Sequence, residues 1–153
     1  MSRSLLVDTA LILTLFLIGI VGYKLSPLLM PKADVTVTPE VGCDLHQTPC
    51  RAVLPSGGHL TLSLSPRPIP VVQPIEMTVS VEGISPDRVQ IDFAGVDMAM
   101  GFNRSTLKAA GTGQFIGPTT LPVCVTGRMT WQATVLLETG SQRMAVPFRF
   151  STG

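Results

Sequence analysis

The chain has 153 residues, of which 45% are hydrophobic and 14% charged, and its formal net charge is +1. This composition is too apolar for a disordered chain, and the length allows one ordinary domain plus a short apolar segment. From Pro31 onward the chain has nine Lys and Arg residues and nine Asp and Glu residues. The basic excess that phosphate-backbone binding requires is therefore missing. Nucleic acid is therefore not an expected partner.

The apolar segment lies at the N-terminus. It carries no charge from Thr9 to Tyr23, and extended from Leu5 to about Leu25 it reaches the roughly 20 residues that cross a bilayer as a helix. A cleaved signal peptide is the alternative, but the nearest cleavage site has Pro31 where a small residue is expected. We therefore predict an uncleaved single-pass transmembrane anchor.

The prolines after this segment predict where the anchor ends. Pro27 and Pro31 should break the helix, so residues 1–30 are predicted to form the anchor and a tether, and residues 31–153 a separate domain. The basic residues on the two sides of the span do not define its orientation. Three cysteines in a β-rich domain favour export, with the domain on the periplasmic side of the cytoplasmic membrane.

Alternating apolar and polar residues dominate the domain. Strands are predicted at 59–65, 75–81, 88–93, 130–137 and 144–150, with further strands near 106–110 and 114–125 and an edge strand at 35–38. Short strands separated by Pro- and Gly-rich turns indicate an all-β antiparallel sandwich of immunoglobulin or cupredoxin type. Trp131, which leads one of the alternating runs, is expected in its core.

The motifs of common enzymes are missing from the sequence. No serine lies in a nucleophile elbow, no glycine-rich loop opens a helix, and the two histidines do not form a helical HExxH pair. We therefore expect a protein that is not an enzyme.

Soft metal ligands are unusually concentrated in the domain. They are Cys43, His46, Cys50, Met98, Met100, Cys124 and Met129. Thioethers and thiolates favour Cu(I), and imidazole is acceptable to either copper state. The pattern indicates a copper site without specifying it.

Each of these residues also has a simpler explanation. Only six residues separate Cys43 from Cys50, so a structural disulfide is favoured, which would remove both as metal ligands. His46 would then lie at the tip of the ring, either as a ligand or exposed to solvent. The Met98 and Met100 pair lies on one face of an extended segment, as ligands or as packing residues. Cys124 is either a ligand or a small buried side chain.

Several short motifs resemble the YtkA/FixH-like group of membrane-anchored immunoglobulin-like proteins. They lie between Val89 and Phe150 and comprise Val96-Asp-Met-Ala-Met-Gly101, Gly113-Gln-Phe-Ile-Gly117, Leu121-Pro-Val-Cys124 and the pair Gly127 and Trp131. The resemblance implies a single anchor, an exported sandwich and an association with copper handling or with the assembly of haem-copper oxidases. It points to Met98 and Met100, with Cys124 beside them. The segment after Cys124 lacks the histidine of true cupredoxins, which argues against a blue-copper carrier.

Two functions from different classes follow. The first is a Cu(I)-binding module at the membrane, with Met98 and Met100 as ligands and Cys124, His46 or Met129 as the third donor. The second is a non-catalytic accessory subunit of a larger membrane complex such as a terminal oxidase, in which the Met turn contacts the partner.

Overall fold

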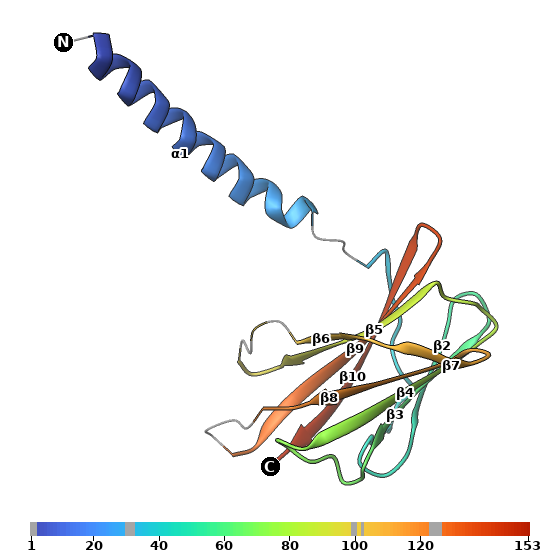
Figure 1. Cartoon of the computed structure of the whole chain (residues 1–153). Coiled ribbons are helices and arrows are strands. Elements are labelled where there is room, and N and C mark those ends of the chain that lie inside the picture. Colours follow the sequence, from blue (N-terminus) through green and yellow to red (C-terminus); the bar gives the residue numbers. More distant parts are fainter. Residues whose placement is uncertain (1–2, 30–32, 99–100, 102, 123–126) are drawn as a thin grey trace. The chain divides into compact units, whose positions relative to one another are not determined.

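The structure is a computed structural model that describes residues 3–29, 33–98, 101, 103–122 and 127–153. The chain divides into two compact units, Met1–Lys32 and Ala33–Gly153. The first unit is helical and the second consists of two packed sheets (Figure 1).

The first unit is the helix α1 (Arg3–Leu29). Its described side chains, those of residues 7–23, are all exposed within the chain, and apolar ones occupy consecutive positions such as 11–13 and 15–18 and therefore cover every side of the helix. The helix continues through Pro27, so the prediction that this proline ends it was wrong. Among the helices in the described part of the chain, none meets the length and hydropathy expected of a membrane span.

The second unit is an all-β sandwich of two five-stranded sheets. Sheet A has the strand order β1 (Val35–Thr36), β10 (Gln142–Thr152), β9 (Met129–Thr139), β5 (Arg88–Gly95) and β6 (Arg104–Thr106). Sheet B has the order β2 (Cys50–Val53), β3 (His59–Ser65), β4 (Pro74–Glu82), β8 (Gln114–Thr120) and β7 (Lys108–Gly111). All neighbouring strands are antiparallel except β1 and β10, which pair in parallel.

The predicted alternation is confirmed in the core. In β3 the three leucines at 60, 62 and 64 are buried, and in β9 every second residue from Met129 to Leu137 is buried. Trp131 is fully buried, as predicted, and its Nε1 donates a hydrogen bond to Thr152 Oγ1 at 2.9 Å. This bond satisfies the one polar group that the indole brings into the core.

The main differences from the predicted strands concern β1, β2, β8 and the segment around Leu107. The short strand β2 was not predicted, β1 covers only two residues, and β8 ends at Thr120. The strand predicted at 106–110 is divided between the two sheets, because the chain crosses from β6 in sheet A to β7 in sheet B at the buried residue Leu107.

Candidate functional site

The segment that contains Met98 begins where β5 ends. Val96 donates its N–H to the carbonyl of Thr130 at 2.9 Å, which holds the start of this segment against the start of β9. Both Val96 and Met98 are exposed, with 42% and 41% of their surface accessible. The described thioether of the predicted Met pair is therefore accessible from outside the sandwich.

Two predicted ligands, Met100 and Cys124, lie outside the described residues. The chain between Cys124 and Met129 at the start of β9 can span at most about 17 Å. The connection that carries Cys124 therefore leads into the strand end beside Val96. The Met98 segment follows the end of β5, and the connection that carries Cys124 runs from β8 of sheet B to the start of β9, which pairs with β5.

Met129, the remaining candidate for a third donor, belongs to the core. It is 4% exposed and lies opposite Thr152 in the β9–β10 ladder. A bond from its thioether to a surface metal ion would require Met129 to leave this packed position.

The predicted disulfide between Cys43 and Cys50 is present, with a Cα–Cα separation of 5.5 Å. Inside the ring, the Asp44 carboxylate accepts hydrogen bonds from the His46 N–H and from Gln47 Nε2, both at 2.9 Å. Leu45 is fully buried in the core. The ring is thus held by its crosslink, by an internal polar network and by one core side chain.

His46 is hydrogen-bonded through both ring nitrogens. Nδ1 accepts the N–H of Ile69 at 3.1 Å, so Nε2 carries the proton and donates to the carbonyl of Ser151 at 2.6 Å. The ring also lies edge-on to Phe150, with centroids 6.1 Å apart. Because Ser151 belongs to β10 of sheet A and Ile69 to the β3–β4 connection of sheet B, His46 joins the two sheets.

Val96, at the start of the Met98 segment, and His46 bond to the two members of one residue pair in the β9–β10 ladder. Thr130, which accepts the bond from Val96, lies opposite Ser151, which accepts the bond from His46. Because β9 lies between β5 and β10, the backbones of Val96 and Ser151 are about two strand spacings, or about 10 Å, apart. Within the described ranges, no group of three or more His, Cys, Asp and Glu side chains could hold a metal ion.

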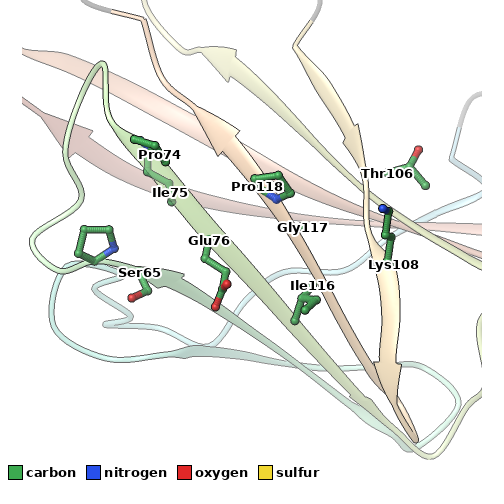
Figure 2. Close-up of a pocket in the computed structure, with 10 residues that line it drawn as sticks. Ser65, Pro74, Ile75, Glu76, Thr106, Lys108, Ile116, Gly117 and Pro118 are labelled. Carbon is green, nitrogen blue, oxygen red and sulfur yellow. The ribbon is translucent and has the colours of Figure 1, made fainter.

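A hollow on the surface of the sandwich was not predicted from the sequence. It has a volume of about 620 Å³ and lies on the outer face of sheet B, over β4, β8 and β7 (Figure 2). Exposed residues such as Glu76, Lys108 and Pro118 line it. These three residues belong to three separate strands. Their proximity depends on how these strands pair, which the sequence pattern does not indicate.

Comparisons with models of known protein families, with curated proteins and with solved structures found no match for this chain. The similarity to the YtkA/FixH-like group therefore remains a resemblance of short motifs.

Proposed function

We propose that this protein is a membrane-anchored, exported immunoglobulin-like domain that binds Cu(I) through Met98, Met100 and Cys124. Two thioethers and a thiolate form a soft donor set that prefers Cu(I) to Zn(II) and to harder ions. Coordination would also favour the thiolate form of the cysteine. The site requires no catalytic step, because its role is to accept or pass on the metal.

The observation that carries this proposal is the hydrogen bond between Val96 and Thr130. It holds the first residues of the Met segment against the strand into which the Cys124 connection leads. Met98 is exposed there and accessible to a metal donor. The site is proposed without Met129, which is buried, and without His46, whose two nitrogens already have hydrogen-bond partners.

The strand arrangement supports the immunoglobulin-like part of the proposal. Two antiparallel sheets pack face to face, and the first strand pairs in parallel with the last one, β10. The chain passes from β4 in one sheet to β5 in the other, and again from β8 to β9, as in sandwiches of this type.

The exposed apolar surface of α1 supports the anchor. Large apolar side chains cover all sides of the described part of this helix, so it needs an apolar environment that its own unit does not provide. The Cys43–Cys50 disulfide favours an oxidising compartment and thus the periplasmic side of the cytoplasmic membrane. A role in the assembly of a haem-copper oxidase rests on the family resemblance.

An accessory subunit that binds no metal is the second candidate. The observation that favours it is the pair of exposed apolar side chains, Val96 and Met98, at the end of β5. Such residues suit a contact with a partner protein, for which the flexibility of methionine is an advantage. In this case the Met segment would contact a larger membrane complex.

A copper competition experiment separates the two candidates. The full chain in detergent, with the Cys43–Cys50 disulfide intact and oxygen excluded, is titrated with Cu(I) against a chromogenic Cu(I) chelator, as wild type and as the variants Met98→Leu/Met100→Leu and Cys124→Ser. Leucine keeps the apolar volume and removes only the sulfur donor. We expect each variant to lose at least about tenfold in Cu(I) affinity, equivalent to about 1.4 kcal/mol.

The matched control is Met77→Leu, which removes a buried thioether of β4 far along the chain from the Met segment. This variant should bind Cu(I) as tightly as the wild type. Equal affinity of all variants, or no competition by the wild type, would contradict the copper site. The accessory-subunit proposal would then stand, and Met98→Ala rather than Met98→Leu should weaken the partner contact.

A further inference from the structure

The hollow on sheet B follows from the crossing of the chain between the two sheets. The ladder of β7 along β8 ends at the pair Lys108 and Ile116, and the preceding residue, Leu107, already passes over into the core. Gly117 allows this passage, because a Cβ there would lie 2.7 Å from Leu107 Cδ2. Beyond Ile116, the side of β8 that faces β7 therefore has no β7 residue paired with it.

The exposed residue Pro118 fits the uncovered edge of β8. Val81 donates its N–H to Gly113, which sets the odd-numbered residues of β8 to bond with β4 and the even-numbered ones to face β7. Pro118 faces the side that β7 has left, and it has no N–H that would need a partner there. The floor of the hollow, Ile116 and Pro118, is thus a built apolar surface (Figure 2).

Two opposite charges stand on either side of this floor. Glu76 on β4 and Lys108 on β7 are both exposed, and neither takes part in an ion pair with any of the described residues. Glu76 lies opposite Pro118 and Lys108 opposite Ile116, so β8 separates them. Two strand spacings across and two residues along correspond to about 12 Å between their Cα atoms.

We propose that this groove binds an extended peptide segment of a partner protein that carries a basic residue, an apolar residue and an acidic residue at positions i, i+2 and i+4, in either chain direction. In an extended chain these three side chains lie on one face, and the outer two are about 13 Å apart. The basic side chain meets Glu76, the acidic one meets Lys108, and the apolar one covers Ile116 and Pro118.

The charge pattern and the shape of the groove select this occupant. A free amino acid also carries both charges, but they are too close together to reach both walls. The volume of about 620 Å³ lies within the range of pockets that hold drug-sized ligands, which is enough for the three side chains of the proposed segment.

The test uses the isotope-labelled full chain in detergent, without metal, and the blocked peptide Lys-Thr-Leu-Thr-Glu. NMR titration should give saturable shifts at Glu76, Lys108 and Ile116. Substitution Lys108→Gln should weaken binding by about 2- to 5-fold, the range of an exposed ion pair. The peptide with Gln in place of Glu should bind wild type and Lys108→Gln equally, which assigns the acidic residue to Lys108.

The control variant is Arg51→Gln, which removes a charge from the outer face of the same sheet but outside the groove. It should leave the affinity unchanged. The proposal is overturned by the absence of saturable shifts, by equal binding of a peptide with adjacent Lys and Glu, or by equal losses in the control. Line broadening at the groove that depends on protein concentration without peptide would assign the site to a second copy and would also overturn it. Because the peptide titration contains no metal, its result does not depend on whether the protein binds Cu(I).

Discussion

His46 is a structural residue of the sandwich as the structure describes it. Its ring accepts a hydrogen bond from one sheet's connection and donates one to the other sheet, and it packs against Phe150. A half-buried imidazole with both nitrogens bonded differs from an open metal ligand, which needs one nitrogen for the ion. The two hydrogen bonds of His46 thus contribute to the stability of the sandwich.

Replacement of His46 by alanine should therefore destabilise the domain. His46→Ala removes two hydrogen bonds and leaves the Ile69 N–H without its acceptor, which should lower the free energy of unfolding by about 2 to 3 kcal/mol. Chemical denaturation of the full chain, followed by the fluorescence of the single Trp131, measures this change. The neighbouring variant Gln47→Ala, which loses one exposed bond to Asp44, should cost less than about 1 kcal/mol. Equal losses in both variants would show that His46 does not join the sheets.

At the scale of elements, the crossing from β6 to β7 is the feature that shapes sheet B. Leu107 is 5% exposed and its N–H donates to the carbonyl of Val89 in β5, while the next residue, Lys108, already pairs with β8. The Leu107 side chain occupies the space that a Cβ atom of residue 117 would need, so only glycine fits there. The crossing and the glycine therefore depend on each other.

This dependence predicts a coupled pair of substitutions. Gly117→Ala forces a methyl group against Leu107 and should cost about 1 to 3 kcal/mol, and Leu107→Val alone should cost about 1 kcal/mol. Together they should cost less than the sum, because valine lacks the Cδ2 atom that the new methyl group meets. Denaturant unfolding of the wild type, the two single variants and the double variant gives the four free energies of this double-mutant cycle. Strict additivity would contradict the contact.

The strands that the sequence alone predicts are those with long alternation. The run of leucines at 60, 62 and 64 and the run that starts at Trp131 both alternate because one face of each strand is buried. Alternation does not identify the sheet to which a residue belongs, so the division at Leu107 was not predictable from it. The strand β2 has only four residues after a disulfide ring, which is too few for a clear period.

The candidate site was predictable only in part for a related reason. The Cys43–Cys50 pairing follows from a short spacing in the chain, and it was predicted correctly. The position of His46 depends on Ser151, which is 105 residues away in sequence, so no local pattern could indicate it. The groove between Glu76 and Lys108 depends in the same way on the pairing of β4, β8 and β7.

At the scale of the whole molecule, the two units differ in whether their apolar side chains are buried or exposed. The second unit buries its apolar residues between two sheets, whereas the described part of α1 exposes almost all of its own. The disulfide closes an eight-residue ring that contains the core residue Leu45. In the chain-entropy model a ring of this size stabilises the folded state by about 2.5 kcal/mol. That contribution exists only where the thiols are oxidised.

The compartment of the domain can therefore be tested through its cysteines. We expect the full chain, isolated from membranes under conditions that block thiol exchange, to react with an alkylating reagent at one cysteine only, Cys124, because Cys43 and Cys50 are paired. Intact-mass measurement after denaturation without reductant counts the labels, and the same sample after reduction should carry three. A chain produced without α1 should remain in a reducing compartment and carry three labels in both samples. Three labels on the unreduced full chain would contradict export and would place the copper proposal in a different compartment.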